Sequence, residues 1–172
     1  PAPDLLEERP PDLVLLSHLH YDHTDLPSLR GLRPATPIVA PRGAGKYLKR
    51  NTGLEICEMA AGEKVRIADV EITALPAEHG RTTPGLRPMT TCLGYTLCNH
   101  LSVYFAGDTD LSEGMNDIGA QYDLDLALLP VWGFGPRVGG GHLTPLTAAR
   151  ALTMLRPRVA VPIHWGALRY AG

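Results

Sequence analysis

Short apolar runs along the chain alternate with segments of helical periodicity, which predicts a mixed α/β fold. The run Leu13–Leu16 is continuous and apolar, as expected of a strand buried on both faces. Polar and apolar positions alternate at 55–59, 64–67 and 70–75, which predicts half-buried antiparallel strands. The remaining predicted strands are 38–40, 91–97, 102–105, 124–129 and 159–163. The second and third of these are predicted to form a hairpin.

Helical periodicity is clearest after Thr144, a favoured N-cap residue that precedes proline at the favoured first helical position. Apolar residues then recur at three-residue steps, which predicts one buried stripe along the helix, and Pro157 ends it. The predicted stripe consists of Leu146, Ala149, Leu152 and Leu155. Shorter helices are predicted at 24–32, 43–50 and 110–122, with Asp110 interpreted as the cap of the last one.

The densest chemistry follows the first apolar run. The segment His18-Leu19-His20-Tyr21-Asp22-His23 holds three imidazoles and one carboxylate. Imidazole nitrogen and carboxylate oxygen are ligands that suit zinc and related divalent metals. On an extended segment His18 and His20 point the same way, whereas the adjacent Asp22 and His23 are expected to diverge. Ligands that point in two directions favour a two-metal centre with open positions, as metal-assisted hydrolysis requires.

Further candidate ligands follow later predicted strands. His79 follows the strand 70–75, Asp108 follows 102–105, and His164 follows 159–163. A single histidine at such a place would more often be structural or solvated, but the recurrence at strand ends favours metal binding. A carboxylate has two oxygens, so Asp108 is interpreted as a bridge between two ions. His100, in the turn of the predicted hairpin, is expected to be exposed to water.

Composition narrows the function classes. The chain has 172 residues, 44% of them hydrophobic and 20% charged, which suffices for one domain with a real core. The net charge of -2 gives no broad attraction to nucleic acid or to anionic membranes. No apolar run reaches the roughly 18 residues of a membrane-spanning helix. The three cysteines form no CxxC pair, which favours reduced thiols and a cytoplasmic location.

The run from His18 to His23 resembles the HxHxDH signature of the metallo-β-lactamase-fold hydrolases. Segments 76–79, 105–109 and 163–166 are similar to the branch that holds N-acyl-phosphatidylethanolamine phospholipase D and the L-ascorbate-6-phosphate lactonases. The resemblance covers most of the chain from about Asp12 onward. It implies a metallo-β-lactamase-type αββα sandwich and a single metallo-hydrolase domain over residues 1–172. This domain is expected to be partial, without the family's opening strands and its C-terminal end.

The resemblance also implies a ligand set and a mechanism. It assigns His18, His20 and His79 to one ion and Asp22, His23 and His164 to a second, with Asp108 between them. Asp22 and His142 are the expected catalytic residues. His142 would donate a proton or orient the substrate, although an ordinary role for a histidine beside a glycine tract stays open. Two divalent ions are expected as cofactors. Zinc fits the imidazole-rich set best, and manganese, iron and nickel stay open.

A hydrolase that uses a bridging hydroxide on a small ester, lactone or phosphodiester is therefore the favoured function. A metal-dependent nuclease of the same fold and a non-catalytic metal-binding module are the alternatives. The loop 132–141 is half glycine and is expected to act as a mobile lid, in which Arg137 could hold an anionic group. Gly43-Ala44-Gly45-Lys46 matches a phosphate loop only in part, and phosphate binding there is discounted.

Overall fold

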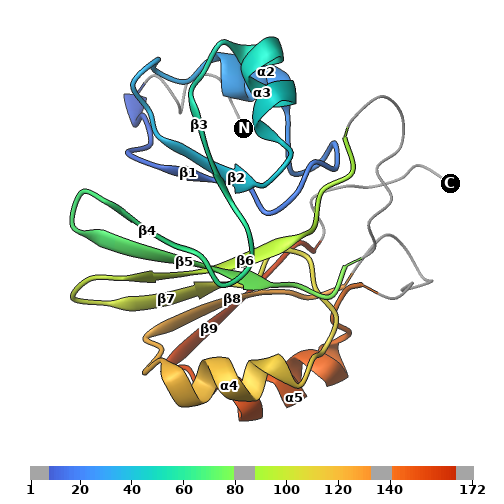
Figure 1. The fold of residues 1–172 in the computed structure, drawn as a ribbon. Coiled ribbons are helices and arrows are strands. Elements are labelled where there is room, and N and C mark those ends of the chain that lie inside the picture. Colours follow the sequence, from blue (N-terminus) through green and yellow to red (C-terminus); the bar gives the residue numbers. More distant parts are fainter. Residues whose placement is uncertain (1–7, 80–87, 133–140, 166–172) are drawn as a thin grey trace, which may run out of the picture. The chain divides into compact units, whose positions relative to one another are not determined.

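The computed structural model describes residues 8–79, 88–132 and 141–165, which fall into two compact units (Figure 1). The first unit comprises the described residues up to Ala60 together with 88–91. The second unit comprises 61–79, 92–132 and 141–165. Within the described residues, each unit combines its own sheet with helices, which confirms the predicted α/β class. None of the described helices combines the length and apolarity needed to cross a bilayer.

The first unit contains a parallel sheet in the order β1-β2-β3. Its elements are β1 (Val14–Leu15), α2 (Leu26–Arg30), β2 (Ile38–Pro41), α3 (Gly45–Thr52) and β3 (Ile56–Met59). The prediction that β3 is antiparallel is wrong, because β3 runs parallel to β2. Helix α3 lies between these two strands in the chain, and a helical crossover returns the chain in its original direction. Leu19, Ile38 and Leu48 are fully buried in the core of this unit.

The second unit contains a six-stranded sheet in the order β4-β5-β6-β7-β8-β9. The strands are β4 (Lys64–Ile67), β5 (Val70–Pro76), β6 (Leu93–Cys98), β7 (Ser102–Phe105), β8 (Leu126–Pro130) and β9 (Val159–Ile163). Strands β4 to β7 pair antiparallel, and β7, β8 and β9 pair parallel. The predicted hairpin around residues 99 and 100 is confirmed. Because β7, β8 and β9 are parallel, their carboxyl ends meet at one edge of the sheet.

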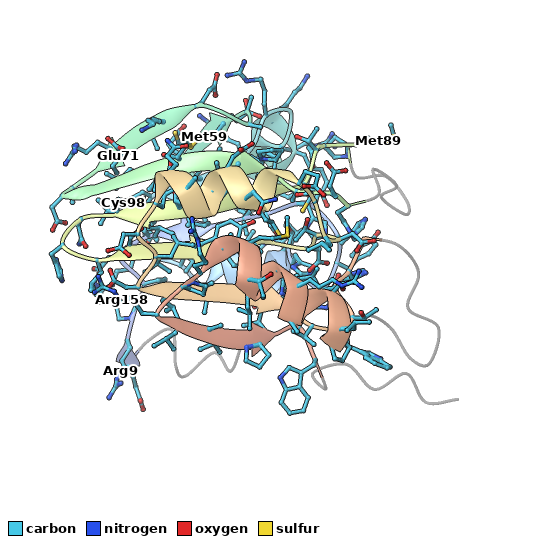
Figure 2. The ribbon with its side chains drawn as sticks, turned by 90° about the horizontal axis from the view of Figure 1, so that it is seen from below. Arg9, Met59, Glu71, Met89, Cys98 and Arg158 are labelled. Carbon is cyan, nitrogen blue, oxygen red and sulfur yellow. The ribbon has the colours of Figure 1, made fainter. Side chains whose placement is uncertain are left out.

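Helices α4 (Gly114–Gln121) and α5 (Pro145–Leu155) lie side by side against one face of this sheet (Figures 1 and 2). They pack on strand residues through a core that includes Tyr104, Ala127, Met115 and Leu155. The helices approach closely at Gly119, where an added Cβ would lie 2.2 Å from the carbonyl oxygen of Met154. Only glycine lets the two backbones come this near.

Helix α5 begins as predicted, but Leu155 is the one residue of the predicted stripe that is buried. Thr144 caps it by accepting from the Thr147 backbone N–H at 3.1 Å. The buried positions are Ala148, Ala151 and Leu155, whereas Leu146 is 66% exposed. Three-residue steps drift by about 60° per step around a helix, so the predicted stripe winds off the buried face. A spacing of three and then four residues stays on it.

Asp110 does not cap a helix. Helix α4 begins four residues later, with Glu113 in the N-cap position. The Asp110 carboxylate instead accepts from the backbone N–H of Leu111 at 2.8 Å. The predicted helix start is therefore wrong, because local turn bonding by aspartate competes with capping in the same residue type.

Strand β9 forms one edge of the described six-stranded sheet. Val159 donates its backbone N–H to the Asp125 carbonyl, and the Ile163 carbonyl accepts from Val131. The odd-numbered residues of β9 thus bond to the β8 side of the sheet. Ala160 and Pro162 consequently direct their main-chain groups away from β8.

Candidate metal-binding site

The histidine-rich motif forms a turn at the carboxyl end of β1, and its side chains gather into a first cluster. This cluster consists of His18, His20, Asp22 and His23. His18 Nε2 lies 2.9 Å from His20 Nδ1, so these two rings do point the same way, as predicted. The His18 and His23 ring centroids lie 4.3 Å apart. Asp22 Oδ2 lies 3.3 Å from His23 Nε2, so the expected divergence of these neighbours is wrong. The chain turns at 21–23 instead of continuing extended.

Buried hydroxyl groups hold this turn in place. The side chain of Thr24 is fully buried and donates to the carbonyl oxygen of His18 at 2.7 Å. The backbone N–H groups of His23 and Thr24 both donate to the carbonyl of His20. The Ser17 hydroxyl lies 3.0 Å from His18 Nδ1. This contact fixes the ring of His18 and leaves its Nε2 facing His20, the orientation that a metal ligand needs.

A second cluster surrounds the carboxylate of Asp108 in the second unit. It consists of His79, Asp108, His142 and His164. Asp108 Oδ2 lies 3.2 Å from His142 Nε2, 3.6 Å from His164 Nε2 and 4.0 Å from His79 Nε2. The Asp108 side chain is only 3% exposed. Ligand atoms from His79, Asp108 and His142 all lie within 4.8 Å of one another. Three ring nitrogens thus converge on one buried carboxylate oxygen.

Backbone carbonyls orient two of these rings. His79 Nδ1 lies 3.0 Å from the carbonyl oxygen of Gly141, and His164 Nδ1 lies 3.3 Å from that of Trp132. A carbonyl oxygen can only accept, so Nδ1 carries the proton in each pair. In the neutral ring Nε2 then carries the lone pair, and it faces Asp108. This is the usual arrangement around histidines that bind metal.

The second cluster assembles because neighbouring strands deliver its members to one edge. Asp108 follows β7, and His164 follows the parallel strand β9. His79 follows β5, and two bonds join its loop to that of Asp108. The Glu78 N–H donates to the Thr109 hydroxyl at 2.9 Å, and the Asp110 N–H donates to the Glu78 carbonyl at 2.9 Å. Rigid strands with cross-linked loops can place ligand atoms accurately.

The cysteines take no part as candidate ligands. Cys92 is buried, and its Sγ donates to the backbone carbonyl of Asp108 at 3.3 Å. Burial, and secondly the nearby Asp108 charge, raise the pKa of the Cys92 thiol to about 12. Within the described residues, none of the groups of side chains that could hold a metal ion includes a cysteine. No disulfide joins Cys92 to Cys57 or Cys98, all of which lie in described ranges.

The partial phosphate-loop sequence is occupied by the protein itself. Glu58 of β3 accepts from the backbone N–H groups of Gly43 and Gly45, at 2.7 and 2.8 Å. An added Cβ at Gly45 would lie 2.8 Å from the Glu58 carboxyl carbon. A carboxylate therefore fills the position that a phosphate would need at the start of α3. This contact agrees with the expectation that the segment does not bind phosphate.

Every predicted ligand thus lies in one of the two clusters, each described within its own unit. The expected lid 132–141 lies outside the described residues except for its two ends, and so does Arg137. Sequence reasoning missed Ser17 and Thr24, although polar residues beside a buried strand were an available signal. It also missed the two backbone carbonyls, for which residue type carries no signal.

Residues 1–165 match the family described as the beta-lactamase superfamily domain. The chain belongs to this family. An uncharacterised protein of Mycobacterium tuberculosis is 32% identical over 93% of this chain, which spans only 45% of that relative. A protein of Methanopyrus kandleri, named a metal-dependent hydrolase, is 34% identical over 93% of this chain and 69% of its own length.

A solved structure gives the same fold for this member of the beta-lactamase superfamily. The structure of Igni18, a metallo hydrolase from Ignicoccus hospitalis, is 26% identical, with a TM-score of 0.77 over 98% of this chain and 70% of that one. The predicted metallo-β-lactamase-type fold is thereby confirmed. The narrower assignment to the phospholipase and lactonase branch stays a prediction.

Proposed function

We propose that this chain carries the catalytic centre of a metal-dependent hydrolase that acts on a small ester, lactone or phosphodiester. The observation that supports it most directly is the convergence of three imidazole Nε2 atoms on the buried Oδ2 of Asp108. A buried carboxylate ringed by imidazoles is a donor set that suits zinc and related divalent ions. The name of the Methanopyrus kandleri relative is consistent with this function.

The ligand assignment draws on both clusters through the order of the motifs in the sequence. His18, His20 and His79 would hold one ion, and Asp22, His23 and His164 a second, with Asp108 shared by both. When bound, the ions would supply Lewis acidity, which lowers the pKa of water and stabilises negative charge that develops on the substrate. Zinc is the proposed metal, and the number of two ions per chain is part of the proposal.

The side chains themselves would contribute orientation and proton handling. Ser17 and the carbonyls of Gly141 and Trp132 hold three ligand rings by their Nδ1 atoms, so that each Nε2 faces another member of its cluster. His142 Nε2 lies within hydrogen-bond distance of Asp108 Oδ2. It is our candidate for the group that passes a proton to the departing group or orients the substrate. Asp22 is proposed as both ligand and catalytic residue.

The substrate class and the setting are parts of the same proposal. The net charge of -2 favours a small molecule over nucleic acid as the partner. Reduced cysteines are consistent with a cytoplasmic enzyme.

The test combines metal analysis with turnover. Protein purified with added zinc should hold about two ions per chain and hydrolyse members of a panel of lactones, esters and phosphodiesters. Asp108→Asn should lower kcat/KM at least about 100-fold and reduce the bound metal, because it removes the buried charge at the centre. Asp110→Asn is the matched control, since within the described residues this neighbouring carboxylate accepts one hydrogen bond, from the backbone N–H of Leu111.

Each of the other outcomes removes a specific part of the proposal. Metal-loaded protein that turns over no member of the panel would leave a non-catalytic metal-binding module. Chelator-sensitive cleavage of RNA would replace the substrate class with that of a nuclease. Protein that binds no metal after purification with zinc would end the proposal as a whole.

A further inference from the structure

We infer that Trp132 and Trp165 form an aromatic subsite beside His164, which holds a planar apolar part of the substrate. The inference rests on the proposed function and narrows it to substrates that carry an aryl or similar flat group. These two residues are the only tryptophans of the chain. Both lie in the second unit, in which the cluster around Asp108 also lies.

The strand register places the two tryptophans at equivalent positions. Strands β8 and β9 are parallel, and their last paired residues are Pro130 and Ile163. Trp132 and Trp165 each follow two residues later, so they leave neighbouring strands at the same edge of the sheet. His164 is joined to both residues through the backbone: it precedes Trp165 directly, and its Nδ1 is 3.3 Å from the Trp132 carbonyl oxygen. Both tryptophans therefore lie on backbone next to the histidine whose Nε2 is 3.6 Å from Asp108 Oδ2.

Neither tryptophan side chain is buried in a hydrophobic core. Trp165 is 64% exposed and Trp132 is 41% exposed, although tryptophan is usually largely buried. Trp132 also has a φ of 77°, in the left-handed region that is rare for bulky residues. Glycine would adopt this backbone without strain and would still offer the same carbonyl to His164. A strained position that keeps a large half-exposed side chain indicates a role for the side chain itself.

The chemistry of the location indicates what the indoles bind. Small-molecule sites combine a few convergent polar groups with aromatic walls that cover the apolar remainder of the ligand. The polar groups here are the imidazoles around Asp108, which would take the carbonyl or phosphoryl end. Indole faces stack on flat apolar groups, whereas a methyl or hydroxymethyl group offers them little contact. A substrate with an aryl group next to the bond that is cleaved fits both parts.

Two stable anions allow binding at the aromatic subsite to be distinguished from binding at the metal centre. Phenylphosphonate and methylphosphonate present the same charged head, and only the first carries a ring. With zinc-loaded protein, calorimetry should give a dissociation constant about threefold to tenfold lower for phenylphosphonate. Phenylphosphonate should also change the fluorescence excited selectively in tryptophan, which reports Trp132 and Trp165 and not the six tyrosines. Neither readout depends on turnover.

Variants then assign the preference to the indoles. Trp165→Leu and Trp132→Leu should each reduce the ratio of the two dissociation constants toward one, while the affinity for methylphosphonate stays unchanged. The conservative changes Trp165→Phe and Trp132→Phe should restore most of the ratio, which a merely structural role would not explain. Leu101→Ala is the matched control, because Leu101 is 51% exposed in the β6–β7 turn, at the other end of β7 from Asp108.

The possible failures are distinguishable. Equal affinity for the two phosphonates, or a ratio that survives in both leucine variants, overturns the subsite and leaves the proposed function standing. Absence of binding by either phosphonate also overturns the subsite. In that case, the zinc content of the same sample decides whether the metal centre has failed with it.

Discussion

Replacing Gly119 by alanine would separate the two helices that cover the second unit's sheet. The added Cβ would lie 2.2 Å from the Met154 carbonyl oxygen and 2.9 Å from the Leu155 Cα. Carbon and oxygen atoms in close protein contacts are normally about 3.3 Å apart, so the helices would have to move apart by roughly 1 Å. The clash is with backbone, so no side chain can rotate away to relieve it.

The magnitude follows from two opposing effects. A radial gap of roughly 0.5–1 Å forfeits about a quarter to a half of the dispersion attraction between facing atoms. Forced overpacking of this kind typically costs about 1–3 kcal/mol, and a backbone clash belongs at the upper end. Alanine in place of glycine returns about 1 kcal/mol of helix propensity. The net expectation is a loss of about 2 kcal/mol in the free energy of unfolding, or roughly 4–8 °C in Tm.

Urea titration and thermal scans followed by circular dichroism measure this loss. Gly114→Ala is the matched control in the same helix, since its nearest contact would be the Ser112 hydroxyl at an ordinary 3.7 Å. It should leave the midpoint unchanged or raise it slightly. If Gly119→Ala proved as stable as Gly114→Ala, the close approach of α4 and α5 at Gly119 would be wrong.

Three further outcomes are expected. Trp132→Gly should be about 1 kcal/mol more stable to urea than Trp132→Ala, because only glycine adopts the φ of 77° without strain, and equal stabilities would contradict that conformation. Ser17→Ala should weaken zinc affinity about 10–100-fold in a chelator competition, since it removes the hydroxyl beside the first motif histidine, whereas Ser17→Thr should retain it. The buried Cys92 should resist thiol reagents at pH 8, well below its pKa of about 12, because the reactive thiolate forms only as the pH rises toward that value. Half-buried Cys57 and Cys98 should react first, and equal rates for all three in native protein would refute the assignment.

Sequence reasoning succeeded where the signal is local. Thr144 followed by proline marks the start of α5, because capping depends on residues a few positions apart. The metal-binding chemistry of the motif from His18 to His23 can likewise be predicted from residue types within one short segment. The gathering of His79 and His164 around Asp108 was inferred from their positions after strands, and the second unit places all three together.

It failed where the outcome depends on distant partners. The direction of β3 is set by the strand with which it pairs, and the sequence of residues 55–59 does not indicate which strand that is. The buried face of α5 is set by where the sheet lies, so Ala148 and Ala151 are buried and Leu146 is not. The carbonyls that orient the histidines belong to the main chain, which every residue type shares.

The proline in β9 has a consequence for how this protein behaves in concentrated solution. Along Val159–Ile163 the outward side of the strand offers the Ala160 N–H, and Pro162 has none to offer. A strand of another molecule that paired with β9 would receive a hydrogen bond from the Ala160 N–H but none from Pro162. Within the described residues β9 is an edge strand with exposed valines, and the missing donor makes this edge a poor template for fibrillar growth.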